Sequence, residues 1–267
     1  MSQFKIGKID MSQIECRILN TVAGQWDVVE KFRAGKDLYS ELASQFYGFP
    51  VDKSMPAERG TGKQLELSCG YGAGGPTIVR TARAGTYGPP VYLSGNQGMA
   101  ARDLYRATHK SVVKLWETGN AFLWHLFNGT TVTWPGCEAV TAHDHRLFGP
   151  GGLWLDFTSL ERHTTEEGEQ IWRHRVKNGW RKTYGARLIE NLIQWLASYP
   201  IRHGMVRISS ELGLKIPLTV HDDIFMLVPV ECVDLFEEAV KIMSQPLPWL
   251  PECPIAVEAK LLDALDE

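Results

Sequence analysis

The sequence predicts an α+β protein, in which strands from both ends of the chain form an antiparallel sheet and a long, mainly helical segment lies between them. Three observations support this fold class. Residues 4–9 alternate into a short strand that ends at Asp10. Residues 218–229 form two apolar runs around His221-Asp222-Asp223, which is typical of a buried β-hairpin. Helical patterns recur between residues 26 and 127.

The hairpin turn is a candidate metal site. Two neighbouring carboxylates between hydrophobic strands are costly unless a cation neutralises them. An ordinary Asp-Asp turn, capped by its own side chains, explains the same residues, so the hairpin alone leaves both interpretations open. Asp10 is expected at the junction of a strand and a helix that starts with a capping box at Ser12 and Glu15. Asp10 and Asp222, distant in sequence, could therefore share one metal site.

Length and composition narrow the class of protein. The 267 residues fit one large domain or two smaller ones. A formal charge of −3 excludes a strongly basic, histone-like binder but allows a basic cleft. The five cysteines are dispersed and show no Cys-x-x-Cys spacing, which predicts a reducing cytosol and neither a disulfide framework nor a zinc site. No signal segment or run of 18 apolar residues occurs, so we expect no membrane span.

A helix expected over residues 56–68 carries the second candidate site. Residues spaced four apart, within this helix and just beyond it, form one gently spiralling face: Arg59, Lys63, Leu67 and Tyr71. An arginine and a lysine one turn apart make a good phosphate clamp. A solvated basic face is the alternative explanation. The glycine-rich run that follows does not match a Walker phosphate loop.

The one strongly basic segment spans residues 172–187 and contains six cations, no acid and several aromatic residues. Such a segment suits backbone phosphates, with aromatic groups for packing or stacking, and a basic surface helix is the alternative. The other expected elements are a loop at 80–90, a long helix at 100–127, strand pieces at 130–156, an exposed loop at 162–169, helices at 187–199 and 231–243, and a strand at 255–261 beside the hairpin.

Read together, these stretches resemble the A-family DNA polymerases, the group of bacterial DNA polymerase I and phage replicative polymerases. Residues 10–17, Asp-Met-Ser-Gln-Ile-Glu-Cys-Arg, resemble the family's first palm motif. Arg59, Lys63 and Tyr71-Gly72 match its fingers-helix motif in residue type and spacing. His221-Asp222-Asp223 resembles the second palm motif, usually His-Asp-Glu. The matches occur in family order and span nearly the whole chain.

The resemblance implies a right-hand polymerase core without thumb and exonuclease: an antiparallel palm sheet from residues 1–20 and 138–267, with helical fingers at 21–137. It implies a DNA-directed DNA polymerase, a nucleotidyltransferase that joins dNTPs to the 3′-hydroxyl of a DNA primer-template with two Mg²⁺ ions. A separate chain is expected to supply thumb and exonuclease. The implied location is the cytosol of a bacterium or a phage-infected host.

The resemblance also assigns roles residue by residue. Asp10, Asp222 and the backbone carbonyl of Met11 hold the metal ions, and Lys63 protonates the leaving pyrophosphate. The dNTP-binding residues implied are Arg59, Lys63, Leu67, Tyr71, Gln13, Glu15 and Met11. The resemblance implies DNA contacts by Gln194 and His221, and the basic segment adds Arg181 and Lys182 as candidate DNA-binding residues.

Two positions depart from the family pattern. Asp223 replaces the usual Glu, which leaves its role open, and Leu67 stands where Phe or Tyr is common. Alternative functions are a single-subunit RNA polymerase, a non-catalytic DNA-binding replisome subunit, and a metal-dependent nuclease. Glu15 argues against the first, because that side chain would block a ribose 2′-hydroxyl. The Arg59-Lys63-Tyr71 face argues against the nuclease, which has no need of it.

Overall fold

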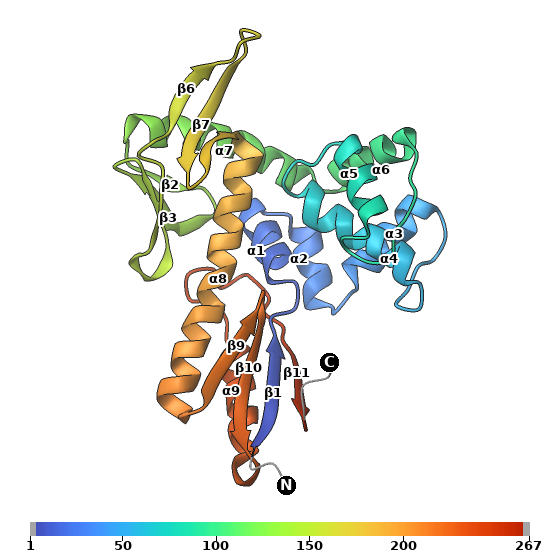
Figure 1. Cartoon of the computed structure of the whole chain (residues 1–267), viewed down its shortest axis with the longest axis vertical. Coiled ribbons are helices and arrows are strands. Elements are labelled where there is room, and N and C mark those ends of the chain that lie inside the picture. The colour runs from blue at the N-terminus through green and yellow to red at the C-terminus, as the bar shows by residue number, and fades with distance from the viewer. Residues whose placement is uncertain (1–3, 264–267) are drawn as a thin grey trace. The chain divides into compact units, whose positions relative to one another are not determined.

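A computed structural model describes residues 4–263 of the chain. The residues divide into two compact units, which are coloured by residue number in Figure 1. Within the described residues, unit 1 comprises residues 4–18 and 193–263, and unit 2 comprises residues 19–192. Helix α1, Ile14–Ala23, and helix α8, Gly185–Leu212, each contribute residues to both units.

Unit 1 is built on a four-stranded antiparallel sheet with the strand order β11-β1-β10-β9. Its strands are β1, Phe4–Asp10, β9, Lys215–Val220, β10, Asp223–Pro229, and β11, Glu258–Leu262. Residues Gly7 and Ile9 of β1 lie opposite Met226 and Ile224 of β10 and are buried with them on one face. Because side chains alternate along a strand, Lys8, Asp10 and Asp223 share the other face.

Helix α9, Asp234–Met243, packs on the buried face of this sheet, as Figure 1 shows. A Cβ atom added to Gly7 would lie 2.6 Å from the ring of Phe236, so a side chain at position 7 would displace the helix. A short 3₁₀ turn, η3, Val230–Cys232, leads from β10 into α9. This packing fixes β1 and β10 and leaves their opposite face available for polar groups.

Within unit 2, a run of helices precedes the strands along the chain. These helices are α2, Trp26–Arg33, α3, Leu38–Tyr47, α4, Pro56–Gln64, the π-helical turn η1, Leu65–Cys69, α5, Gly75–Ala84, α6, Gly95–Thr108, and α7, Lys110–Asn128. Asp37 caps α3, since its carboxylate accepts a hydrogen bond from the Ser40 backbone N–H. Gly62 allows close packing, because a Cβ atom there would overlap the carbonyl oxygen of Tyr39.

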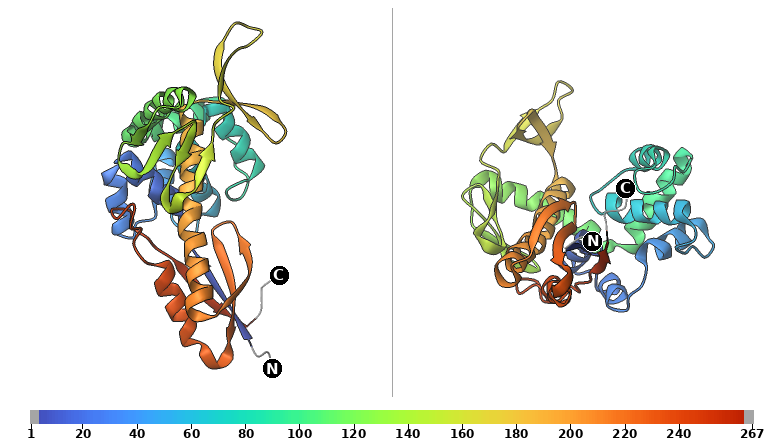
Figure 2. Two further views of the ribbon diagram at one scale, coloured as in Figure 1. Left: turned by 90° about the vertical axis from the view of Figure 1, so that its left-hand side faces the viewer. Right: turned by 60° about the horizontal axis from the view of Figure 1, so that its bottom comes forward.

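Two small antiparallel sheets complete unit 2. The first has the order β2-β3-β4-β5, with strands Val132–Trp134, Cys137–His143, Arg146–Phe148 and Trp154–Asp156, and a 3₁₀ turn η2, Pro150–Gly152. The second has the order β6-β7-β8, with strands Glu161–Thr164, Gln170–Val176 and Gly179–Thr183. The β6–β7 hairpin extends beyond the neighbouring strands of its unit in both views of Figure 2.

The α+β fold with antiparallel sheets is confirmed, as are the opening strand and the hairpin whose turn holds His221 and Asp222. No disulfide joins any two of the five cysteines, all of which lie within the described residues. No helix within residues 4–263 combines the length and apolar character needed to cross a membrane. The division into palm at 1–20 and 138–267 and fingers at 21–137 stays a prediction.

Several local predictions are wrong. Arg80 lies in helix α5 rather than in a loop, because Pro76 starts a helix that buries Ile78 and Ala82. Residues 161–164 are strand β6, because they pair with β7. The long helix over 100–127 is broken at His109.

Three expectations near the ends of elements also change. Helix α1 begins at Ile14, and the hydroxyl of Ser12 donates a hydrogen bond to Glu258 at 3.3 Å. Residues 172–183 of the basic segment lie in a pair of strands rather than in a surface helix, and Arg187 lies in α8. The last strand pairs with β1 rather than with the hairpin.

Candidate active site

The carboxylates of unit 1 gather where β1 ends and the β9–β10 hairpin turns. Asp10, the last residue of β1, is the register partner of Asp223, the first residue of β10. Asp222 lies in the two-residue turn between the strands, and its backbone carbonyl accepts a long hydrogen bond of 3.4 Å from the N–H of Met11. His221 precedes it with a positive φ of 55°, an uncommon conformation that the tight turn requires. Two distant chain segments therefore bring three carboxylates together.

Lys8 supplies a cation to this group. Its Nζ atom lies 3.0 Å from Oδ2 of Asp223, and both side chains are partly buried. Residues 8 and 10 project from the same face of β1, since alternate residues of a strand do so. The ammonium thus neutralises one of the three carboxylates directly.

Burial and crowding of like charges alter the acidity of the group. Burial is the larger cause that raises the pKa of Asp10 to about 6, and repulsion from Asp222 and Asp223 adds to it. The hydrogen bond to Asp223 raises the pKa of Lys8, with attraction to the three carboxylates in the same direction, although burial opposes them. The site therefore carries more negative charge than Lys8 alone offsets.

The donor set fits a divalent cation of the Mg²⁺ type. Such ions take oxygen ligands, commonly from one or two carboxylates together with substrate phosphates. Oδ1 of Asp223 is buried without a hydrogen-bond partner among the described residues, which is costly unless a cation or water satisfies it. No group of three or more His, Cys, Asp or Glu side chains within residues 4–263 is arranged to enclose a metal ion. One or two of these carboxylates would leave most coordination positions of such an ion to other oxygen ligands.

The other predicted residues of unit 1 lie on or near these elements. The carbonyl of Met11 accepts a 3.2 Å hydrogen bond from the N–H of Ile14, which leaves it a second lone pair. Gln13 has a positive φ of 54° and a buried Oε1 atom with no hydrogen-bond partner in the described part of the chain. Glu15 lies in the first turn of α1, and Gln194 is exposed on α8.

The predicted phosphate clamp lies in unit 2, on α4. The guanidinium of Arg59 is held by Asp37 through two bonds, from Nε to Oδ2 at 2.7 Å and from Nη2 to Oδ1 at 3.2 Å. The same guanidinium lies 5.2 Å from the ring centre of Tyr39. Lys63, one turn further on, is half-buried. Arginine and lysine therefore share one side of a helix, and Asp37 fixes the arginine.

The spiralling face is only partly as predicted. Arg59 and Lys63 lie on α4, but Leu67 lies on the π-helical turn η1, and Tyr71 follows in a turn after Gly70. A π turn joins residues five positions apart, whereas an α-helix joins residues four apart, so it changes the direction of every side chain after it. The spacing of four therefore describes a continuous face only as far as Lys63.

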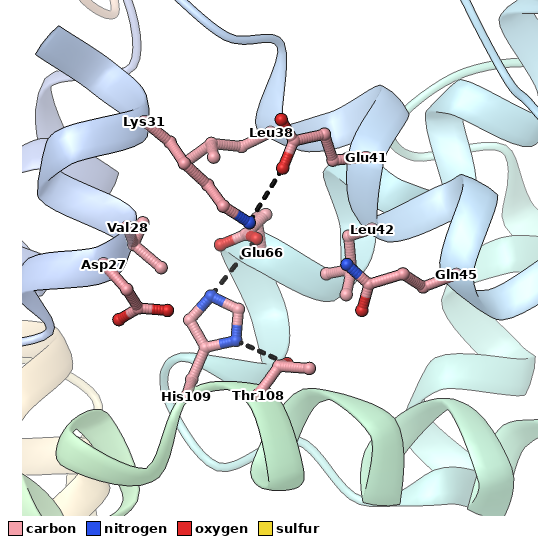
Figure 3. Close-up of a pocket in the computed structure, with 10 residues that line it drawn as sticks. All are labelled: Asp27, Val28, Lys31, Leu38, Glu41, Leu42, Gln45, Glu66, Thr108 and His109. Carbon is pink, nitrogen blue, oxygen red and sulfur yellow. Dashed lines mark hydrogen bonds and ion pairs between the residues drawn. The ribbon is translucent and has the colours of Figure 1, made fainter. Parts of the chain in front are cut away.

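A cavity of about 170 Å³ lies beside η1 (Figure 3). Most of its lining residues are polar: the Nε2 atom of His109 lies 3.4 Å from Oε1 of Glu66, and Lys31 binds Glu41 at 2.8 Å. Glu66 and His109 are almost fully buried. The predicted triphosphate residues Arg59 and Lys63 do not line this cavity, so it is separate from their side of the helix.

Arg181 and Lys182, both predicted to bind DNA, lie on strand β8 and are exposed. Lys182 Nζ binds Oε1 of Glu169 at 3.0 Å. Sequence reasoning missed Lys8, although its place two residues before Asp10 on a strand was a usable signal. It did not pair Asp37 with Arg59, because no local pattern joins two residues that lie 22 positions apart.

Comparisons with known proteins show what the chain as a whole is similar to. The model of the family described as DNA polymerase family A matches residues 2–117 of this chain. A DNA polymerase of Bacillus phage SP02 is 26% identical over 95% of this chain and 40% of its own length. DNA polymerase I of Mycobacterium bovis is 36% identical over 63 residues, which are 24% of this chain and 7% of that protein.

A solved structure has a similar fold. The POL domain of Pol1 from M. smegmatis, in complex with DNA primer-template and dNTP, superposes with a TM-score of 0.64 and 17% identity. The superposition covers 99% of this chain and 40% of that one. The chain thus spans about 40% of the phage relative and of the solved domain.

Proposed function

We propose that this relative of the A-family DNA polymerases carries out template-directed DNA synthesis, joining a dNTP to the 3′-hydroxyl of a DNA primer. The observation that carries the proposal is the meeting of Asp10 with Asp222 and Asp223 at one end of an antiparallel sheet. The likeness to the phage DNA polymerase over 95% of the chain supports it. A protein of this kind acts on DNA and dNTPs in a bacterial or phage-infected cytosol.

In this proposal Asp10, Asp222 and the carbonyl of Met11 hold two Mg²⁺ ions. When bound, the ions make the primer hydroxyl more acidic and neutralise charge on the triphosphate. The chain's own contribution is a rigid anionic platform. Strand pairing between β1 and β10 holds Asp10 and Asp223 opposite each other, so the carboxylates need no rearrangement before the reaction. Lys8 limits their mutual repulsion.

Arg59 and Lys63 bind the triphosphate in this proposal. Asp37 occupies the Nε and Nη2 side of the Arg59 guanidinium and keeps it pointed in one direction, which leaves the N–H groups of Nη1 and the second N–H of Nη2 for phosphate oxygens. Lys63 is half-buried, so its charge is less screened than that of an exposed lysine. It donates a proton to pyrophosphate as that group leaves.

The remaining residues select and position the substrates. Tyr71 and Leu67 pack near the new base pair, Gln13 contacts the nucleotide, and Glu15 excludes a ribose 2′-hydroxyl. Gln194 contacts the DNA minor groove, His221 lies near the primer end, and Arg181 and Lys182 contact backbone phosphates. We further propose that thumb and exonuclease elements come from outside these 267 residues, with a separate chain as the source to test.

Single-turnover primer extension tests the proposal, with enzyme in large excess over a labelled primer-template so that weak DNA binding does not hide the chemistry. Wild-type protein with dNTPs and Mg²⁺ should extend the primer, and Asp10→Asn should reduce the rate by at least about a hundredfold. Lys5→Met, on the same strand but outside the site, is the matched control and should extend normally. Extension by the Asp10→Asn variant at the wild-type rate would overturn the site assignment.

A further inference from the structure

The β6–β8 sheet of unit 2 has one buried face and one polar face. Trp172 and His174 of β7 are buried, and their rings contact Trp124 and Phe127 on α7 and Phe157 after β5. Alternate residues must then face outward. The register pairs Arg173 with Lys182 and Arg175 with Trp180, so the outward face carries these four side chains: Arg173, Arg175, Trp180 and Lys182. We refer to this face as the β7–β8 platform.

The platform carries excess positive charge at the end of its hairpin. Arg173 binds Glu161 at 2.6 Å and Lys182 binds Glu169 at 3.0 Å, so two of its cations are already paired. Arg175 is exposed, as is Lys177 in the β7–β8 turn. Within residues 4–263, neither of these two has a carboxylate at ion-pair distance. The paired cations are therefore followed by unneutralised ones towards the turn, which is the charge pattern that attracts a polyanion.

Trp180 presents an aromatic ring in the middle of these cations. The Trp180 side chain is 45% exposed, whereas Trp172 on the neighbouring strand β7 is buried. The guanidinium of Arg173 lies 4.5 Å from the Trp180 ring centre and therefore holds the ring in place. Strand β8 is also an edge strand, so nothing in the sheet covers it from that side. An ordered, exposed indole beside cations suits a flat, anionic ligand.

We propose that the β7–β8 platform binds single-stranded DNA, with an unpaired base stacked on Trp180 and its phosphates near Arg175 and Lys177. Unpaired bases have free faces for stacking, whereas the bases of a duplex are already stacked on each other. Charge complementarity selects the polyanion, and the exposed indole selects its single-stranded form. The role as a contact for unpaired template rests on the proposed function, while binding itself does not.

Fluorescence anisotropy with a labelled 16-nucleotide oligo(dT) tests this inference, in EDTA and without dNTPs. Trp180→Ala should weaken binding by roughly fivefold or more, since one stacked base is lost. Arg175→Ala should lower the slope of log K against log salt concentration by about 0.7, the value for one phosphate contact on a single strand. Trp26→Ala and Lys110→Ala, which remove an exposed indole and an exposed ammonium elsewhere in unit 2, should leave binding unchanged.

Three results would overturn the inference: equal binding by wild type and Trp180→Ala, equal loss in the Trp26→Ala control, or displacement of the oligonucleotide by a 16-base-pair duplex or by polyglutamate as readily as by unlabelled oligo(dT). Far-ultraviolet circular dichroism confirms that each variant is folded. If the wild-type protein binds oligo(dT) through Trp180 but does not extend a primer, the proposed function alone is contradicted. Normal extension with binding that ignores Trp180 would contradict this inference alone.

Discussion

Lys8 binds Asp223 across two neighbouring strands, with 3.0 Å between Nζ and Oδ2, beside the carboxylate of Asp10. The ion pair distinguishes the three acids of the site. Asp223 has one oxygen committed to an ammonium of the protein, whereas Asp10 has its pKa raised to about 6 by burial and by the two other carboxylates. Among the residues that the structure describes, Asp10 and Asp222 have no such ammonium partner at this site, so a bound cation would reduce the repulsion among the three carboxylates by binding these two acids.

Removing the ammonium should destabilise the sheet. In Lys8→Met the carboxylate of Asp223 loses its partner while one of its oxygens stays buried, and we expect the free energy of unfolding to fall by about 1 to 2 kcal/mol. Lys5→Met is the matched control, because Lys5 binds the exposed Asp263 and should change stability by less than about 0.5 kcal/mol. Urea unfolding measures both. Equal losses of unfolding free energy in the two variants would mean that the Lys8–Asp223 pair stabilises the protein no more than an exposed ion pair does.

Asp222 and Asp223 should differ in their importance for primer extension. We expect Asp222→Asn to lower the single-turnover rate by at least about a hundredfold, because it removes a proposed metal ligand. Asp223→Asn should lower the rate by less than about tenfold, since the Asp223 carboxylate already forms an ion pair with Lys8. Rapid-quench measurement of the labelled primer checks both rates. The reverse order of effects would exchange the roles assigned to these two residues.

Gly62 is expected to be essential for the packing of α4 on α3. A Cβ atom at this position would overlap the Tyr39 carbonyl oxygen, which is backbone and cannot turn away. Gly62→Ala should therefore reduce the free energy of unfolding by about 2 to 3 kcal/mol. Gly95→Ala is the control: Gly95 begins α6 and has nothing within 4 Å of an added Cβ, so stability should change by less than about 0.5 kcal/mol. Two similar values would show that the close approach is not maintained.

The Asp37–Arg59 pair should make stability depend on pH. Burial alone would raise the pKa of Asp37, but hydrogen bonds from Arg59 and Ser40 outweigh it and hold the pKa below its ordinary value. A carboxyl with a lowered pKa in the folded state stabilises the protein above its unfolded pKa and loses that contribution as the pH falls through its folded pKa. The difference in urea midpoint between wild type and Asp37→Asn should therefore be larger at pH 6 than at pH 3.

Asparagine still caps helices well, so Asp37→Asn isolates the charge from the capping interaction. A midpoint difference that is the same at both pH values would mean that ionisation of Asp37 does not contribute. The variant should also weaken dNTP binding, because Arg59 loses the group that holds its fork in one direction.

Elements whose pattern is local and regular could be predicted from the sequence. The strand ending at Asp10 and the hairpin around Asp222 follow from alternation and turn residues, and they place both acids correctly. Helix α5 was missed because Gly74 and Pro76 resemble a loop, although proline is favoured in the first turn of a helix. The π turn at Leu65–Cys69 was missed because no local residue signal distinguishes it from an α-helix.

Pairings between distant residues could not be predicted in the same way. The β6–β8 sheet depends on the register that sets Arg173 opposite Lys182, and the alternation of its strands is obscured by cations on both faces. The contacts of Lys8 with Asp223 and of Arg59 with Asp37 depend on which segments the fold brings together. Both involve residues that, in sequence, are equally consistent with solvated surface charge.

Single-nucleotide incorporation tests the central claim most directly. Four primer-templates that differ only in the first unpaired template base are each mixed with one dNTP at a time, Mg²⁺ and excess protein, and extension is followed in the first turnover. We expect each template to direct incorporation of its complementary dNTP, with rNTPs and the Asp222→Asn variant giving little product. Incorporation that ignores the template base, prefers rNTPs, or persists in Asp222→Asn would contradict template-directed DNA synthesis at this site.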